Sequence, residues 1–199
     1  MLFRSIMSNK KFDFPFYDCE TKLKDKVFLR QPKGNDWKDY TWEEVGLTAR
    51  KLATGLKSLG LKEKSHIGLV SKNCSEWIIA DLAITMAGYV SVPFFPTLKS
   101  NEMNHLIEFG DVEALFVGKL EGNWDEMKKG IDTENLPIIA FPHYEGNSKV
   151  DEGYQWHDFI NKFEPQTENY YPAVDDVWTI IFTSGTTGAS KGAVIKYQS

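Results

Sequence analysis

Residues 179–195 read Thr179-Ile180-Ile181-Phe182-Thr183-Ser184-Gly185-Thr186-Thr187-Gly188-Ala189-Ser190-Lys191-Gly192-Ala193-Val194-Ile195, a loop of small residues between two apolar runs. Both runs contain β-branched residues, which favours strands on either side of the loop. The glycines at positions 185, 188 and 192 allow the backbone to adopt positive φ and to bring its N–H groups close to an anion. The stretch is therefore predicted to be a strand–loop–strand unit that binds phosphate.

The loop also carries side chains that suit a phosphate ligand. Ser184, Thr186 and Thr187 supply hydroxyl donors, and Lys191 supplies a positive charge on a flexible stem. The order of residues differs from that of a P-loop, in which Gly-Lys-Ser/Thr opens a helix, because Lys191 precedes Gly192 and a β-prone run follows. The alternative interpretation is an ordinary turn between two strands, since glycine, serine and threonine are also favoured in turns.

The composition is that of an ordinary globular protein. The 199 residues are 42% hydrophobic and 26% charged, which fits a sizeable core and about one or two domains. A net charge of −5 gives no electrostatic reason to expect a nucleic-acid partner, because binding to phosphate backbones needs clustered lysine and arginine. Cys19 and Cys74 form no C-x-x-C pair, so neither a disulfide framework nor a zinc site is predicted. The histidines lack metal-ligand spacing and are interpreted as structural or surface residues: His66, His105, His143 and His157.

The chain is predicted to be neither secreted nor membrane-spanning. Residues 1–7 contain one basic residue and an apolar run too short for a signal peptide. No window reaches the ~18 consecutive apolar residues of a membrane span. A cytoplasmic location is therefore expected, and this leaves peripheral contact with a membrane surface open.

Local signals predict the elements that precede the loop. Residues 8–40 contain two short apolar pieces on either side of Pro32-Lys33-Gly34-Asn35-Asp36, which predicts a hairpin. Thr41-Trp42-Glu43-Glu44 is a capping box that starts an amphipathic helix ending near Gly60. Further strands are expected at 66–70, 89–93, 114–117 and 136–141, and further helices at 75–87 with Ser75 as N-cap, 100–109, 125–129 and 156–163.

Short apolar strands thus alternate with amphipathic helices along the middle of the chain. The alternation predicts a mostly parallel sheet, because parallel strands need crossover connections and helices usually supply them. Such crossovers are right-handed and place helices on both faces of the sheet. The expected fold class is α/β, a mostly parallel sheet covered by helices on both faces that ends in the phosphate-binding hairpin.

Residues 183–192, Thr-Ser-Gly-Thr-Thr-Gly-Ala-Ser-Lys-Gly, resemble the signature T-S-G-T-T-G-x-P-K-G of the adenylate-forming superfamily. That superfamily includes acyl-CoA synthetases, luciferases and the adenylation domains of peptide synthetases. Ser190 stands where the superfamily usually has proline, which affects the stiffness of the loop more than its phosphate chemistry. Two weaker resemblances, at residues 39–45 and 83–96, occur in the order that the superfamily shows.

The resemblance implies an enzyme that joins a carboxylic acid to AMP at the expense of ATP, with Mg²⁺, and then passes the acyl group to coenzyme A. By similarity, Lys191 and Thr186 are expected to be catalytic, and either Thr183 or Thr186 is expected to lie near the metal. The residues expected to bind the phosphates of ATP are Thr183, Ser184, Gly185, Thr186, Thr187, Gly188, Lys191 and Gly192. The expected partners are therefore small molecules: the carboxylic acid, ATP and coenzyme A.

In the superfamily, the adenine pocket, the acidic magnesium ligand and a late catalytic lysine follow this loop. The chain is accordingly interpreted as the N-terminal part of a longer enzyme, with an arm and hairpin at 1–40 and an incomplete AMP-binding domain at 41–199 that is expected to be inactive alone. The leading hypothesis is an acyl-CoA synthetase, most similar to the branch that activates fatty acids. The alternatives are an adenylating enzyme that loads a carrier protein, a nucleotide-binding module without turnover, and a structural fragment.

Overall fold

The computed structural model describes residues 10–183 and 191–199. The helices are α1 (Pro15–Leu23), α2 (Trp42–Ser58), α3 (Ser75–Ala87), α4 (Ser100–Phe109), α5 (Trp124–Met127), the 3₁₀ helix η1 (Lys128–Gly130) and α6 (Trp156–Ile160). The strands are β1 (Val27–Lys33), β2 (Asp36–Thr41), β3 (His66–Val70), β4 (Val90–Phe94), β5 (Val112–Val117), β6 (Ile138–Ala140), β7 (Tyr154–Gln155), β8 (Val177–Thr183) and β9 (Lys191–Lys196).

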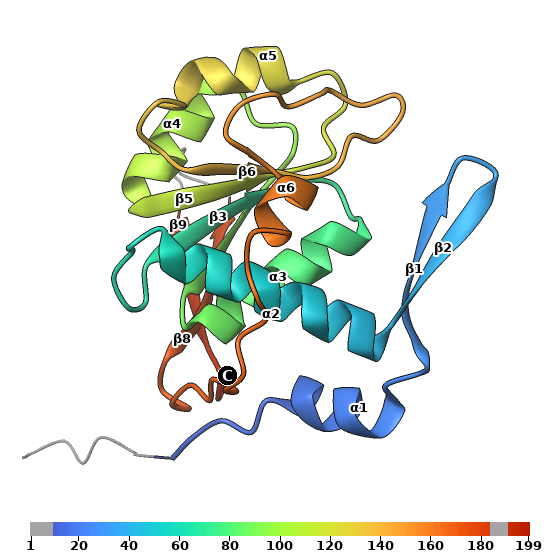
Figure 1. Ribbon diagram of the computed structural model, residues 1–199. Coiled ribbons are helices and arrows are strands. Elements are labelled where there is room, and N and C mark those ends of the chain that lie inside the picture. The colour runs from blue at the N-terminus through green and yellow to red at the C-terminus, as the bar shows by residue number, and fades with distance from the viewer. Residues whose placement is uncertain (1–9, 184–190) are drawn as a thin grey trace, which may run out of the picture.

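The main sheet has the strand order β7-β6-β5-β3-β4-β8-β9, as far as the described ranges show it (Figure 1). All neighbouring strands in it are parallel except β8 and β9, which form an antiparallel pair. The remaining strands, β1 and β2, form a separate hairpin that extends away from the sheet (Figure 1). The mostly parallel α/β sheet is therefore confirmed, as are the two antiparallel strands on either side of the predicted loop.

Helices cover both faces of the sheet, because alternate residues of its central strands point to opposite sides. Ile67 and Phe116 join a core cluster with α2, α3 and α6, whereas Val70 and Leu115 join a second cluster with α4 and α5. Figure 1 shows these two helical layers with the sheet between them. The strands are consequently buried on both faces, as expected for a parallel sheet.

The start of α2 shows how local sequence sets an element. The Thr41 hydroxyl accepts a hydrogen bond from the Glu44 N–H at 3.2 Å, and the Thr41 N–H donates to the Glu44 carboxylate at 2.7 Å. Both bonds of the capping box are thus present, and two amides that a helix N-terminus leaves free are satisfied. The predicted start of this helix is confirmed.

One predicted helix cap was wrong, and two short elements were not predicted. Cys74, with an extended backbone at φ −159°, is the N-cap of α3, and Ser75 is instead the first helical residue, whose hydroxyl donates to Glu76. The helix α1 was not predicted, because it is short and its first residue is Pro15, a residue that also marks loops. The strand β7 was not predicted either, since its two residues carry no periodic pattern.

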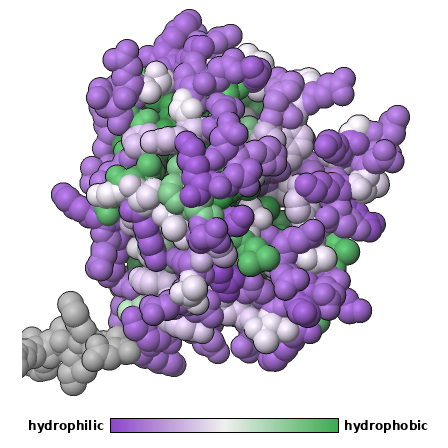
Figure 2. All heavy atoms as spheres, viewed as in Figure 1, coloured by the Kyte–Doolittle hydropathy of each residue, from purple (hydrophilic) through white to green (hydrophobic). Residues whose placement is uncertain are grey.

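The outer face of the molecule is mainly hydrophilic in the view of Figure 2. In the ranges 10–183 and 191–199, no helix combines the length and hydropathy needed to cross a bilayer. Exposed apolar side chains gather along the last hairpin, where Trp178, Ile181 and Val194 are 39%, 38% and 58% exposed. Among the strands that the structure describes, β9 pairs only with β8, so the other edge of β9 is open there.

Candidate functional site

The predicted phosphate loop begins and ends at one pair of residues. Thr183 is the last residue of β8, Lys191 is the first residue of β9, and the two are antiparallel partners. Both side chains are exposed, so the hydroxyl and the ammonium group are accessible to a ligand. Residues Ser184, Gly185, Thr186, Thr187 and Gly188 lie outside the described residues, and their phosphate-binding roles stay predictions.

The sheet directs this loop to the edge where ligands usually bind. The strand β8 pairs in parallel with β4 through Ser91 and Thr179, so its carboxyl end lies at the same edge as those of β3, β4, β5 and β6. In open α/β sheets, ligands bind in the crevice outside the carboxyl ends of the strands. The placement of Thr183 and Lys191 therefore fits a ligand-binding role.

Lys191 is available to an anionic ligand as far as the described ranges show. Lys191 forms no ion pair with any described acidic residue. The other lysine of the strand, Lys196, lies 3.9 Å from Asp175, measured from Nζ to Oδ1. A lysine without a carboxylate partner has its N–H donors available for a ligand. The two ends of β9 thus present one lysine at the loop and one beside an acid.

The structure assigns Gly192 a packing role in addition to the predicted contact with phosphate. Gly192 is the strand partner of Phe182, and a Cβ atom on it would approach the Phe182 ring and Ile180 to 3.3 Å. That distance is shorter than an ordinary van der Waals contact, so the ring lies against the backbone only because the side chain is absent. Sequence reasoning missed this role, because it depends on a neighbour in the adjacent strand.

The described residues do not form a magnesium site by themselves. No group of three or more histidine, cysteine, aspartate or glutamate side chains in these ranges is placed to hold a metal ion. Thr183 offers a single hydroxyl, whereas Mg²⁺ prefers octahedral oxygen ligands that include one or two carboxylates. The histidines have other contacts: His66 Nδ1 lies 2.6 Å from the Gly110 carbonyl, and His143 Nε2 lies 3.0 Å from the Asn147 carbonyl.

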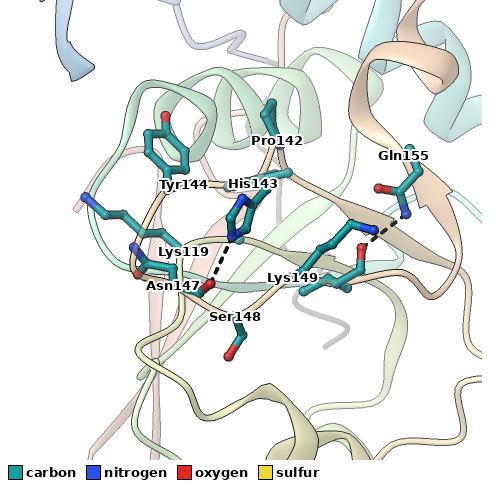
Figure 3. Close-up of a pocket in the computed structure, with 11 residues that line it drawn as sticks. Lys119, Pro142, His143, Tyr144, Asn147, Ser148, Lys149 and Gln155 are labelled. Atoms are coloured by element: carbon teal, nitrogen blue, oxygen red, sulfur yellow. Dashed lines mark hydrogen bonds between the residues drawn. The ribbon is translucent and has the colours of Figure 1, made fainter. Parts of the chain in front are cut away.

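A small cavity of about 40 Å³ lies at the same edge of the sheet, beyond the ends of β5 and β6. Figure 3 shows Lys119, His143 and Lys149 among its lining residues. At roughly 10–15 Å³ per water molecule, it has room for about three waters and none for a nucleotide. A larger cavity of about 840 Å³ lies at the opposite edge, near Lys64 and Tyr170, away from the loop.

A buried polar network holds the segment after β6 against the start of α3. Glu76 is only 6% exposed, and its Oε2 accepts hydrogen bonds from the Tyr144 hydroxyl at 2.5 Å and from the Ser75 hydroxyl at 3.0 Å. Burial and the nearby Glu76 carboxylate raise the pKa of Tyr144, so the phenol keeps its proton and acts as the donor. Neither residue was singled out from the sequence, because they lie 68 positions apart and no short motif joins them.

Burial also determines the protonation state of the Cys74 thiol, which lies next to this network. It raises the pKa of the Cys74 thiol to about 11, which keeps the sulfur protonated at neutral pH. Cys19 and Cys74 are both free thiols. Cys74 is therefore a packing residue of the α3 N-terminus and not a nucleophile.

The described residues thus form an open α/β sheet with Thr183 and Lys191 exposed at its carboxyl edge. The profile of the AMP-binding enzyme family matches residues 16–199. The chain belongs to this family.

The chain is also similar to individual proteins of known name. It is 29% identical over 171 residues to long chain acyl-CoA synthetase 1 of Arabidopsis thaliana, covering 81% of this chain and 26% of that protein. It is 30% identical over 175 residues to the peroxisomal long chain acyl-CoA synthetase 6 of the same plant, covering 81% and 24%. It is 26% identical over 179 residues to fatty acyl-CoA synthetase A of Dictyostelium discoideum, covering 86% and 27%. The chain thus spans about a quarter of the length of these relatives.

Solved structures share the fold. The anthranilate CoA ligase AuaEII in complex with anthranoyl-AMP superposes with a TM-score of 0.78 at 19% identity, covering 92% of this chain and 34% of that one. A benzoate CoA ligase from Burkholderia xenovorans gives 0.74 at 16% identity, with the same coverage. At these identities the likeness establishes the fold alone.

Proposed function

We propose that this chain is the N-terminal part of an ATP-dependent, AMP-forming ligase that joins a carboxylic acid to the thiol of coenzyme A. Residues 1–40 would form an arm and hairpin, and residues 41–199 part of the AMP-binding domain. One observation carries the proposal: Thr183 and Lys191, which begin and end the stretch that resembles the family's phosphate-binding signature, pair at the carboxyl edge of the sheet.

A fatty acid is the acid that we propose as substrate. The support is the similarity to proteins named long chain acyl-CoA synthetase and fatty acyl-CoA synthetase, which cover four fifths or more of this chain. The same names support coenzyme A as the thiol. We also propose a cytoplasmic location, although one of the relatives is described as peroxisomal.

The physical problem in such a reaction is charge. A carboxylate must attack the α-phosphate of ATP, so the negative charge on the triphosphate has to be neutralised and the leaving pyrophosphate has to be held in place. Lys191 would supply a positive charge to the β- and γ-phosphates, and Thr183 a hydroxyl donor at the other end of the loop. Gly192 would let the strand approach the ligand without a side chain in between. The nucleotide would bring Mg²⁺ with it, since these residues offer the ion at most one oxygen.

The test is ATP–pyrophosphate exchange by the full-length protein, with short, medium and long fatty acids, followed by a measurement of acyl-CoA formation. Lys191→Ala is compared with Lys196→Ala, a substitution of the same kind at the other end of β9. Lys191→Ala should lower kcat/KM for ATP by roughly ten- to a thousand-fold, the loss expected for one preorganised charge contact, with little change in Tm. Lys196→Ala should leave ATP kinetics within about two-fold.

The outcomes separate the proposed function from its alternatives. Exchange without acyl-CoA formation would indicate an enzyme that loads a different thiol, such as a carrier protein. Binding of ATP without exchange would indicate a nucleotide-binding module. If Lys191→Ala and Lys196→Ala changed kcat/KM for ATP equally, Lys191 would have no specific role in binding phosphate.

A further inference from the structure

The Phe182 side chain is enclosed by aromatic rings from two other elements. Phe182 lies on β8 immediately before Thr183 and is 6% exposed. Its ring stacks on Phe94 of β4, with centroids 6.0 Å apart and an angle of 1° between the ring planes. Phe109, the last residue of α4, contacts it at 5.8 Å and 49°. The residue that precedes the loop is thus packed against both a neighbouring strand and a helix.

Two glycines close the slot around this ring. A Cβ atom on Gly110, in the turn between α4 and β5, would lie 3.2 Å from Phe182 Cζ and 3.3 Å from Cε2. A Cβ atom on Gly192 would lie 3.3 Å from Phe182 Cε1, on the other side of the ring. Both distances are shorter than ordinary contacts, so the ring has no free space at either edge. We call this set of residues, Phe94, Phe109, Gly110 and Gly192, the Phe182 slot.

The Phe182 slot lies directly at the base of the predicted phosphate loop. Phe182 pairs with Gly192, and the next pair along the hairpin is Thr183 with Lys191. Fixing the Phe182 ring therefore fixes the backbone one residue before the loop begins and, through Gly192, one residue after it ends. The stack on Phe94 ties this pair to β4, which the parallel ladder also joins to β8.

We infer that Phe182 is a positioning residue for ATP, which sets the place of Thr183 and Lys191 without touching the nucleotide. The inference rests on the proposed function. A preorganised contact loses most of its effect when it moves, and a displacement of about 1 Å can cost up to ~100-fold in rate. Phe182 is buried on the α4 side of the sheet, whereas Thr183 and Lys191 are exposed, so the aromatic ring acts through the backbone.

The experiment compares Phe182→Leu with Phe116→Leu in the full-length protein. Phe116 is also a buried phenylalanine of the same sheet, but it lies on β5, packs on Phe141 and Trp156, and belongs to the cluster on the other face. Both substitutions should lower Tm, because each removes a buried ring. Only Phe182→Leu should raise KM for ATP, by about ten-fold, while KM for the carboxylic acid stays unchanged in both variants.

A second variant keeps the inference testable if Phe182→Leu does not fold. Phe94→Leu leaves Phe182 and the loop intact and removes only the stacked ring, so it should raise KM for ATP in the same direction by a smaller factor. Combined with Phe182→Leu, it should add little, because the two rings act as one unit. Unchanged KM for ATP in Phe182→Leu and Phe94→Leu, with Tm lowered as in Phe116→Leu, would reduce the slot to a structural role.

Hydrogen exchange separates failure of the inference from failure of the proposed function. Without any nucleotide, the amides of Thr183 and Lys191 should exchange faster in Phe182→Leu than in wild type, and at the wild-type rate in Phe116→Leu. A wild-type protein without ATP–pyrophosphate exchange would overturn the proposed function, and the role in positioning ATP with it. Active wild-type protein with unchanged amide exchange in Phe182→Leu would overturn the positioning role alone.

Discussion

Tyr144→Phe removes one atom from the buried network at the start of α3. The lost hydroxyl donates to Glu76 Oε2 at 2.5 Å, and the carboxylate is 6% exposed with the Ser75 hydroxyl as its other donor. A hydrogen bond to a charged group contributes about 1.5–3 kcal/mol, and water has little access to replace the lost donor. We therefore expect the free energy of unfolding to fall by about 1.5–3 kcal/mol.

The assay is urea denaturation, with thermal unfolding as a second measurement. For a chain of this length, about 2–4 °C of Tm is lost per kcal/mol, so Tm should fall by about 3–12 °C. Tyr154→Phe is the matched control, because Tyr154 is 41% exposed and its hydroxyl has no hydrogen-bond partner in the part of the chain that the structure describes. It should change stability by less than about 0.5 kcal/mol.

A double-mutant cycle isolates the contact. Glu76→Gln removes the charge that the Tyr144 hydroxyl binds, so Tyr144→Phe should cost less in the Glu76→Gln background than in wild type. A Tyr144→Phe protein as stable as the Tyr154→Phe control would refute the reasoning. Equal costs of Tyr144→Phe in the two backgrounds would do the same, because they would mean that the Glu76 charge adds nothing to the contribution of the Tyr144 hydroxyl.

Two further predictions concern the start of α2 and the carboxyl group of Asp81 on α3. Thr41→Ala removes the acceptor for the Glu44 N–H and should lower the free energy of unfolding in urea by about 1 kcal/mol. The control is Thr48→Ala, because the Thr48 hydroxyl donates to the Glu44 carbonyl within the same helix and caps nothing. Equal losses of stability in the two variants would contradict the capping role of Thr41. Burial raises the pKa of Asp81, so the folded state holds its proton more tightly than the unfolded state does. The contribution of Asp81 to stability should therefore be fully present below the unfolded carboxyl pKa of about 3.9 and should be lost as pH rises through the raised folded value. Asp81→Asn should remove that part of the pH dependence in urea denaturation from pH 4 to 8, and an unchanged pH profile would show that Asp81 does not titrate differently in the two states.

The sequence predicted best where the signal was local. The Thr41–Glu44 capping box acts within the first turn of α2, and each apolar strand or amphipathic helix is marked by the pattern of its own residues. These features were enough to predict the parallel sheet, because burial on both faces leaves few other arrangements. The prediction of Ser75 as the N-cap of α3 was wrong by one residue, because Cys74 holds the N-cap position through its extended backbone and makes no side-chain capping bond.

The candidate site was predicted in part. The glycine-rich stretch indicated a strand–loop–strand unit, and the pairing of Thr183 with Lys191 agrees with it. The environment of Phe182 could not be predicted, because Phe94, Gly110 and Gly192 are brought to its ring by three different elements. The contact between Glu76 and Tyr144 has the same origin, since it depends on where the segment after β6 crosses α3. Long-range contacts of this kind follow from the tertiary fold, which a linear pattern does not record.

The strand order also bears on synthesis at the ribosome. The outer edge of β4 pairs with β8, yet Ser91 and its partner Thr179 are 88 positions apart. At roughly 5–20 residues per second, translation reaches Thr179 about 4–18 s after Ser91. During that interval the nascent chain presents a buried-type strand, Val90–Phe94, with one edge unpaired. During this interval a chaperone that covered the unpaired edge of Val90–Phe94 would protect the chain from pairing with other strands.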